Sequence, residues 1–422
     1  MKTLLKNGRI LKMNGEDIFF ASIVIEDDRI LYIGDDYEQY GPFDIVRDIK
    51  GNVLMPGFKN AHTHSAMTFL RSKADDTSLQ DWLFGTVIPR EQKMKPKDVC
   101  EMSKLAFLEY LTSGITACFD MYYFPFSTAK AAEEIGMRVV LIGTYNNDYD
   151  IDALYSEFHG KDRLARYGFG VHAEYTLAKN ELERVVASAH KNKEPVFAHI
   201  AETEKEVKEC YEKRGMSPVA FFEKMGAFEY GGGGYHCIYL SDDDIEIFKK
   251  HNCYVVTCPG SNTKLASGIA PICKYIERGL TVAIGTDGPA SNNSLDMFKE
   301  MTLLYAMQKV TLKDPAVLPA YEILKMATVN GAKAMRLDDS DILEVGKKAD
   351  IIEIDLNRPN MQPINNIVSN IVYSGSKENV KMTMINGKIL YKDGKFYLKE
   401  KPSTIYRKVQ KIGERIEKQM GK

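Results

Sequence analysis

The chain has 422 residues, 44% of them hydrophobic and 27% charged, which is enough apolar sequence to bury a large core. Its formal net charge is -2, and acidic and basic residues are interspersed, so it lacks the basic surface of a nucleic-acid-binding protein and the polybasic patch of a membrane-surface protein. We therefore expect a small-molecule partner, with no nucleic acid and no membrane.

The seven cysteines are odd in number, scattered and without a CxxC pair, which is typical of reduced thiols and argues against structural zinc bound by cysteines. The first residues, MKTLLKNGRILKMNGEDIFF, contain only short apolar pieces interrupted by charges, and no later run approaches the length of a membrane span. These features predict a cytoplasmic protein.

Residues 1–52 contain three short β patterns, KTLLKNGRILKM, SIVIEDDRILYIG and IVRDIKG, separated by Gly, Asn and Asp turns. They predict the first part of a small β-sandwich. The pattern changes at VLMPGF, and from residue 53 to 336 short β-branched runs alternate with longer helical patterns such as KDVCEMSKLAFLEYLTSG.

Eight strand-like runs follow residue 52: VLMPGFKNAHTH, GITACFDM, RVVLIGTY, YGFGVHA, PVFAHIAE, GYHCIYL, NCYVVTCP and LTVAIGTDG. Eight strands alternating with helices predict an α/β fold, a (β/α)₈ TIM barrel whose catalytic groups lie at the C-terminal ends of the strands. The run GGGG at 231–234 predicts a flexible loop before the sixth strand.

Residues 337–400 return to short strands, ADIIEIDL, KMTMINGKILYKDG and KFYL, with NG and DG turns between them. We expect this segment to complete the β-sandwich begun by residues 1–52, beside the barrel formed by residues 53–336. Residues 401–422, with IYRKVQKIGERIEKQMGK, predict a charged amphipathic C-terminal helix.

Five of the eight histidines fall at or near the ends of predicted barrel strands: His62, His64, His172, His199 and His236. In an extended strand residues i and i+2 point to the same face, so the pair in NAHTH aims two imidazoles at one point. This indicates a metal site. An isolated HxH pair has an alternative explanation, in which one histidine caps a strand and the other is a hydrogen-bonded core residue.

The eighth strand ends in GTDG, which puts Asp287 at the same rim as the histidines. Three imidazoles and one carboxylate, from His62, His64, His199 and Asp287, suit zinc or iron(II) and leave room for a water ligand. Metal coordination lowers the pKa of water from about 16 towards 7, which provides a hydroxide nucleophile at neutral pH. Asp287, as a neighbour of that water, can take its proton.

The segments PGFKNAHTH, HIAET, HC after a Gly-rich run, SNTKLASGIAPI and GTDGPASNNSLDMFKEM resemble the amidohydrolase superfamily over nearly the whole chain. The last two segments most resemble the methylthioadenosine and S-adenosylhomocysteine deaminases, close to chlorohydrolases and guanine deaminases. Several amidohydrolases bridge two metals with a carboxylated lysine on strand four, but RYGFGVHAEYT has no lysine. The resemblance therefore implies one Zn²⁺ per subunit, with Fe²⁺ as an alternative, in a homo-oligomer.

The resemblance also implies catalytic roles for two residues and a substrate contact for a third. Glu202 would protonate a ring nitrogen of the heterocycle, and His236 would hydrogen-bond the attacking hydroxide and steady the tetrahedral intermediate. His172 would contact the substrate, as would Glu202 and Asp287. The alternatives are a surface carboxylate that opens a helix for Glu202, and packed strand or core histidines for His236 and His172.

The segment DWLFGTVIPRE contains Glu91 and the only tryptophan, Trp82. Glu91 resembles the carboxylate that binds two vicinal ribose hydroxyls in nucleoside-type members, and Trp82 resembles a wall of the substrate pocket; an acid at a helix start and a large buried side chain are the alternatives. Ser291, in PASNN, lines the pocket by the same resemblance.

One loop departs from the family pattern. Adenosine-type deaminases of this family carry arginines in the loop after strand three that reach the substrate, but TYNNDYDIDALYSEFHGKD has none. Here the loop offers Asn146, Asn147, Asp148 and Asp150. We expect the reaction to be kept, with the adenosine moiety held differently or replaced by another aminated heterocycle.

These features together predict a metal-dependent hydrolase of C–N bonds in cyclic amidines, one that deaminates methylthioadenosine, S-adenosylhomocysteine or adenosine to the inosine-type product and ammonia. A second hypothesis keeps the site but changes the substrate to guanine, a pterin or an s-triazine, with an amine or halide as the leaving group. A third is a noncatalytic metal-binding paralogue, although the ligands and the acid are all present.

Overall fold

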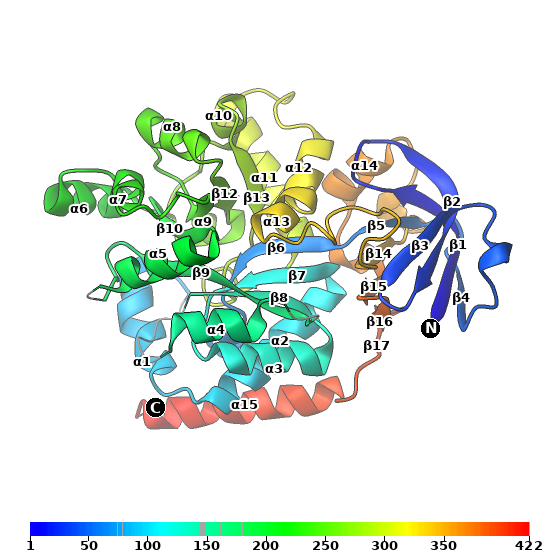
Figure 1. Cartoon of the computed structure of the whole chain (residues 1–422), viewed down its shortest axis with the longest axis horizontal. Coiled ribbons are helices and arrows are strands. Elements are labelled where there is room, and N and C mark those ends of the chain that lie inside the picture. Colours follow the sequence, from blue (N-terminus) through cyan, green and yellow to red (C-terminus); the bar gives the residue numbers. More distant parts are fainter. Residues whose placement is uncertain (74, 78, 144–148, 161–162, 179, 422) are drawn as a thin grey trace.

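The computed structural model describes residues 1–421 except 74, 78, 144–148, 161–162 and 179. A barrel of parallel strands lies beside a mixed β-sheet, which is at the right of Figure 1, and the C-terminal helix runs along the outside of the barrel. The barrel strands are β6 (Phe58–Thr63), β7 (Ile115–Asp120), β8 (Arg138–Ile142), β9 (Ala165–Ala173), β10 (Val196–Ile200), β11 (Gly232–His236), β12 (Tyr254–Thr257) and β13 (Thr281–Ile284).

The eight strands pair in chain order, each parallel to the next. The ring closes between its first and last strands, where the Asn60 side chain accepts a hydrogen bond from Thr286 N at 2.8 Å and donates one to Thr286 Oγ1 at 2.7 Å. The predicted TIM barrel is confirmed, and its eight strands are the eight predicted from sequence. Its interior is filled by apolar and aromatic side chains, among them Phe119, Phe197 and Tyr235.

Helical segments cover the barrel and carry the loops above it. They are η2 (Ser65–Leu70), η3 (Asp81–Val87), α1 (Ile88–Glu91), α2 (Pro96–Thr112), α3 (Pro125–Ile135), α4 (Ile151–Phe158), α5 (Glu181–Asn192), α6 (Glu204–Arg214), α7 (Pro218–Lys224), α8 (Asp242–Lys250), α9 (Pro259–Lys264), α10 (Ile272–Glu277), α11 (Met297–Leu312), α12 (Ala320–Met326) and α13 (Val329–Ala334). Several begin at a hydroxyl N-cap: the Ser241 hydroxyl, for example, accepts a hydrogen bond from Asp244 N at the start of α8.

The two ends of the chain combine in one nine-stranded sheet, in the order β17-β16-β15-β14-β5-β1-β2-β3, with β4 also paired to β1. Its strands are β1 (Lys2–Leu11), β2 (Ile18–Glu26), β3 (Arg29–Gly34), β4 (Ile45–Asp48), β5 (Val53–Pro56), β14 (Ile351–Ile354), β15 (Val380–Ile385), β16 (Lys388–Lys392) and β17 (Lys395–Phe396). Short helical turns, η1 (Glu38–Tyr40), η4 (Pro359–Met361), α14 (Ile367–Ser369), η5 (Asn370–Ser374) and η6 (Lys377–Asn379), connect them.

The structure divides the run VLMPGF between the two sheets. β5 lies between β1 and β14 in the nine-stranded sheet, and the barrel begins only with β6. The run VLMPGF is apolar on both sides of Gly57, and both strands are fully buried, so the break at Gly57 leaves no change in hydropathy within the run.

The predicted flexible loop at 231–234 is wrong. Gly232, Gly233 and Gly234 belong to β11 and are buried. A Cβ at Gly232 would lie 2.1 Å from Val196 O, and one at Gly233 would lie 2.4 Å from Tyr254 O. Glycine is needed at these positions because the neighbouring strands lie too close for a side chain. The run of glycines therefore reflects close packing of the barrel strands and not a flexible loop.

The predicted C-terminal helix is α15 (Pro402–Gln419), which buries Ile405, Val409 and Ile416. It lies along α2 on the outside of the barrel (Figure 1). Within the described part of the chain, no helix combines the length and the apolar character needed to cross a bilayer.

Candidate active site

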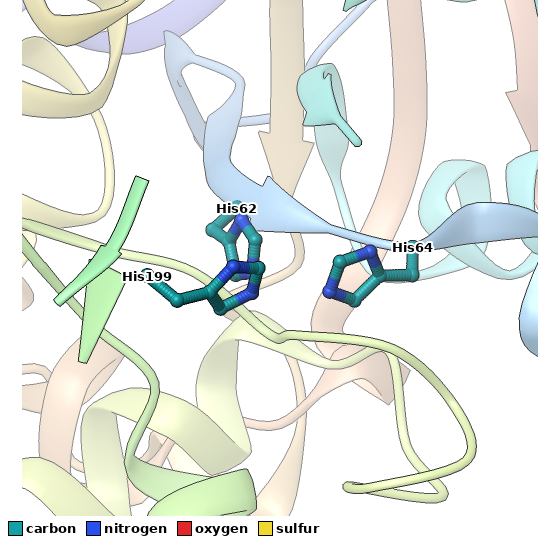
Figure 2. Close-up of side chains that lie close together, drawn as sticks. All are labelled: His62, His64 and His199. Atoms are coloured by element: carbon teal, nitrogen blue, oxygen red, sulfur yellow. The ribbon is translucent and has the colours of Figure 1, made fainter. Parts of the chain in front are cut away.

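Three histidines meet at the C-terminal end of the barrel. His62 is the second-last residue of β6, His64 follows that strand directly, and His199 lies in β10. Figure 2 shows their three imidazoles side by side, and the ring centre of His62 is 4.8 Å from those of His64 and His199. One ring nitrogen from each lies within 4.8 Å of the others, a spacing that could hold a metal ion.

Asp287 joins this cluster from the segment after β13. Its Oδ1 lies 3.3 Å from His64 Nε2 and 3.6 Å from His62 Nε2. Its Oδ2 accepts hydrogen bonds from the hydroxyls of Ser261 at 2.6 Å and Ser291 at 2.9 Å. Burial raises the pKa of Asp287, but His64, His236 and these donors outweigh it and hold that pKa below its usual value, so the group is a carboxylate.

The ring orientations leave nitrogen lone pairs facing the cluster. His64 Nδ1 donates to Met121 O at 2.6 Å and His199 Nδ1 donates to His172 O at 2.7 Å, so Nε2 of each is free to bind a metal. Neither ring nitrogen of His62, which is completely buried, has a hydrogen-bond partner among the described residues.

The same histidines are held in the state that a metal requires. Burial first, and then the neighbouring imidazoles, push the pKa values of His62 and His199 well below the usual range, so both rings are neutral. Neutral imidazoles, a carboxylate and an orphaned ring nitrogen in one buried place are the donor set of a transition-metal site. The residues therefore fit a metal ion.

Glu202 and His236 face Asp287 across the cavity. His236 Nε2 lies 3.8 Å from Glu202 Oε2 and 4.0 Å from Asp287 Oδ2, and its Nδ1 donates to Asn262 Oδ1 at 2.7 Å. Burial raises the pKa of Glu202, with Asp287 adding to that effect against His236. Burial lowers the pKa of His236, but Glu202 and Asp287 reverse the shift and raise it. The pair can thus hold and exchange protons.

The cavity that contains these groups has a volume of about 230 Å³. Its lining combines the chemical groups with apolar side chains: His64, Met67, Leu79, Trp82, Leu83, Ile88, Glu91, Tyr123, His172, Tyr175, Thr176, His199, Glu202, His236, Leu265 and Asp287. A buried polar cluster at one end and an apolar wall at the other are typical of a site for a small organic molecule.

Glu91 and Trp82 also line the cavity. Glu91 is buried and accepts a hydrogen bond from the Tyr122 hydroxyl at 2.6 Å; burial raises its pKa to about 7, against the effect of that hydrogen bond. Trp82 is 6% exposed and its indole N–H points at Ala290 O, 3.4 Å away. Both side chains line the cavity, but Glu91 also lies in the first turn of α1 and Trp82 is also buried in the core, so their substrate contacts stay predictions.

His172 and Ser291 are placed differently from one another. His172 lines the cavity, with its Nδ1 2.8 Å from Thr176 Oγ1, and burial lowers its pKa to about 3. Ser291 is fully buried behind Asp287, to which it donates, and is absent from the described lining. Its substrate contact stays a prediction.

The loop after β8 that departs from the family pattern is described only in part. Asn146, Asn147 and Asp148 lie outside the described residues. Asp150 is the N-cap of α4, where its carboxylate accepts hydrogen bonds from the backbone N–H groups of Asp152 and Ala153.

Several residues that build the site were not assigned roles from sequence. Glu206 is buried and accepts hydrogen bonds from the backbone N–H of Ala201 at 2.7 Å and of Glu202 at 2.8 Å, fixing the turn that carries the acid. Asn262 and Ser261, which orient His236 and Asp287, lie in the SNTKLASGIAP motif that carried the resemblance. Glu206 offered no such signal, because it opens an ordinary charged helix.

The chain is similar throughout to proteins of one family. The profile described as Amidohydrolase family matches residues 53–390. The 5-methylthioadenosine/S-adenosylhomocysteine deaminase of Thermoanaerobacter pseudethanolicus is 40% identical over 405 residues, which cover 92% of this chain and 94% of the relative. The 5'-deoxyadenosine deaminase of Methanosarcina acetivorans is 38% identical over 406 residues, 92% of each chain.

Among solved structures, an adenosine deaminase from Xanthomonas campestris with bound zinc superposes with a TM-score of 0.91 at 28% identity, covering 99% of this chain and 98% of the other. The family profile, the relatives and the barrel with its rim of histidines agree, and the chain belongs to the amidohydrolase family.

Proposed function

We propose that the protein is a hydrolytic deaminase of an adenosine-type nucleoside: methylthioadenosine, S-adenosylhomocysteine, 5'-deoxyadenosine or adenosine. The observation that carries this proposal is a cavity lined by Glu202, His236, Asp287 and Glu91, beside three imidazoles that could hold a metal ion. Relatives named as deaminases of such nucleosides, at 40% and 38% identity, support the substrate class.

His62, His64, His199 and Asp287 would hold one metal ion, for which we propose zinc because the similar adenosine deaminase structure binds zinc. Iron(II) is the alternative that the same donors accept. The ion would supply Lewis acidity, lowering the pKa of a water molecule to about 7.

The proton transfers fall to the side chains around that point. Glu202, whose pKa burial raises, would give a proton to a purine ring nitrogen, which makes the adjacent carbon electrophilic. Asp287, held as a carboxylate, accepts the proton of the attacking water. His236, oriented by Asn262, donates a hydrogen bond to the incoming oxygen. The amine would then leave the tetrahedral carbon as ammonia, taking the proton that Asp287 accepted, and the hydroxyl on that carbon would return its proton to Glu202 as the carbonyl forms.

Substrate binding is assigned to the rest of the cavity. Glu91 would accept hydrogen bonds from the two ribose hydroxyls, because its side chain lines the cavity. The hydrogen bond from the Tyr122 hydroxyl to Oε1 orients the carboxyl group there. Trp82 would pack against the nucleoside and His172 would contact the base. Ser291 would act on the nucleoside through Asp287, to which its hydroxyl donates a hydrogen bond.

We further propose a cytoplasmic location and a homo-oligomeric state. All seven cysteines are free and buried, which supports a reducing compartment. A small-molecule nucleoside is the expected partner in either oligomeric state.

Ammonia release tests the proposed function. Purified zinc-loaded protein is assayed with methylthioadenosine, S-adenosylhomocysteine, 5'-deoxyadenosine, adenosine, guanine and a pterin, beside a chelator-treated control. We expect chelator-sensitive activity on at least one of the adenosine compounds. Activity on guanine or the pterin alone would support the hydrolytic mechanism but refute the substrate class and the ribose role of Glu91. Absence of ammonia release with every compound would refute the proposal.

A further inference from the structure

One wall of the cavity comes from a single stretch of chain. Residues 73–91, which follow β6 and η2 and include η3 and α1, are called here the wall segment. Its described residues contribute Leu79, Trp82, Leu83, Ile88 and Glu91 to the lining. The shape of this side of the cavity therefore depends on what holds the wall segment in place.

Glu417, in the last turns of α15, contacts both ends of the wall segment. At the far end its carboxylate receives two hydrogen bonds from the Arg90 guanidinium, Nε to Oε1 at 2.9 Å and Nη2 to Oε2 at 3.3 Å. At the near end Lys73 Nζ lies 3.4 Å from Oε1. Figure 1 shows the C-terminal end of α15 close to α1.

The contact with Arg90 is specific in geometry. The Arg90 and Glu417 side chains are 7% and 20% exposed, and a two-point contact between a guanidinium and a carboxylate fixes both orientation and distance. Successive residues of a helix point about 100° apart. When Arg90 of α1 points outward to Glu417 of α15, its neighbour Glu91 therefore points towards the cavity. Inside the cavity, Glu91 then meets the Tyr122 hydroxyl.

The helix that carries Glu417 is itself firmly seated. Its apolar side chains Ile405, Val409 and Ile416 are buried, and Arg415 forms a 2.5 Å ion pair with Asp98, which caps the start of α2. The helix α2 thus holds α15 in place, and Glu417 of α15 in turn holds the wall segment through Arg90.

We propose that Glu417 is a positioning residue for substrate recognition: from outside the barrel it holds Glu91 and Trp82 at their places in the cavity. This inference rests on the proposed nucleoside deaminase function. It predicts that the C-terminal helix sets the affinity for the ribose of the substrate while the chemistry at the metal ligands is unaffected.

The test compares Glu417→Gln with a matched control, Glu400→Gln. Glu400 precedes α15 and also binds two cations, Lys104 at 3.0 Å and Lys408 at 2.6 Å, but among the described residues it forms no ion pair with the wall segment. Both variants remove one carboxylate charge from the surroundings of α15, so a general loosening of the helix would affect them alike.

Two readouts follow the wall segment. The first is KM for adenosine beside that for 2',3'-dideoxyadenosine, which lacks both hydroxyls. In Glu417→Gln we expect KM for adenosine to rise about ten- to hundredfold, the value of one charge-assisted hydrogen bond, with kcat unchanged. KM for the dideoxy compound should rise less, because that compound keeps the contact with Trp82 but has no hydroxyls for Glu91 to bind. The second is the fluorescence of Trp82, the only tryptophan, which should shift to longer wavelength and become more accessible to acrylamide.

The outcomes separate this inference from the proposed function. Unchanged KM and fluorescence in Glu417→Gln, or equal changes in Glu400→Gln, would overturn the positioning role. If the wild-type protein deaminates no nucleoside, the proposed function fails instead, and the fluorescence of the two variants still decides whether Glu417 positions the wall segment.

Discussion

Replacing Glu202 with glutamine tests the proposed acid with little change in shape. Glu202 is 6% exposed, and its Oε1 accepts a hydrogen bond from Ser267 Oγ at 3.3 Å that a glutamine oxygen can also accept. The backbone N–H of residue 202 still bonds Glu206. Glu202→Gln therefore keeps the cavity but cannot deliver a proton to the purine ring.

The size of the loss follows from the environment of the carboxyl. A general acid contributes about 10²–10⁴-fold to a rate. Burial raises the pKa of Glu202, so its carboxyl group holds a proton more readily than an exposed glutamate does, and the substitution removes the whole contribution of that acid. We expect kcat to fall about a thousandfold, which corresponds to about 4 kcal/mol of transition-state stabilisation.

The assay is ammonia release at saturating nucleoside, with the metal content of each preparation measured by mass spectrometry. Glu204→Gln, an exposed glutamate two residues along in α6, is the control and should keep wild-type activity and metal. A loss smaller than about tenfold would mean that Glu202 is not the acid. Loss of metal from Glu202→Gln, with the ion retained in the control, would show that Glu202 serves the ligand cluster instead.

Four further substitutions test other parts of the structure. His62→Ala should lower the bound metal from one ion per chain towards none, because it removes a ligand with no other hydrogen-bond partner among the described residues; full occupancy would refute the ligand set. Wild-type KM for adenosine should fall as pH rises through about 7, where Glu91 ionises and becomes the stronger acceptor, and Glu91→Gln should abolish that dependence; the same slope in both proteins would exclude Glu91. Asn262→Ala should lower kcat roughly ten- to hundredfold by releasing His236, with KM little changed; an altered KM alone would contradict the assignment. Arg138→Met should cost about 3–5 kcal/mol of unfolding free energy, measured by denaturant titration, because Arg138 and Asp350 form a two-point buried ion pair between β8 and the nine-stranded sheet; a loss below about 1 kcal/mol would refute that estimate.

The barrel could be predicted because its strands and helices alternate regularly along the sequence. Each strand is a short buried run bounded by turn residues, and the helices between them have a different spacing, so eight alternations were countable. The candidate metal cluster followed from the same pattern, since strand ends converge at one rim. The pair His62 and His64 needed only the two-residue repeat of an extended chain.

Other features depend on contacts that no local pattern carries. Gly232 resembles a loop residue until β10 and β12 are placed on either side of it. The division of VLMPGF between two sheets depends on β14, far along the chain, pairing with β5. The link from Glu417 to Arg90 joins two surface-like charges whose partnership only the folded molecule reveals.

The nine-stranded sheet also constrains the order in which the polypeptide can assemble during synthesis. β5 has its two neighbours in β1, which precedes it, and β14, which is made roughly 300 residues later, a wait of about 15–60 s at ribosomal elongation rates. During that time the backbone N–H and C=O groups on the β14 side of β5 have no strand to pair with. An unpaired strand edge of this kind can pair with other chains. The nascent N-terminal strands therefore lack the partner on this side until the last strands leave the ribosome.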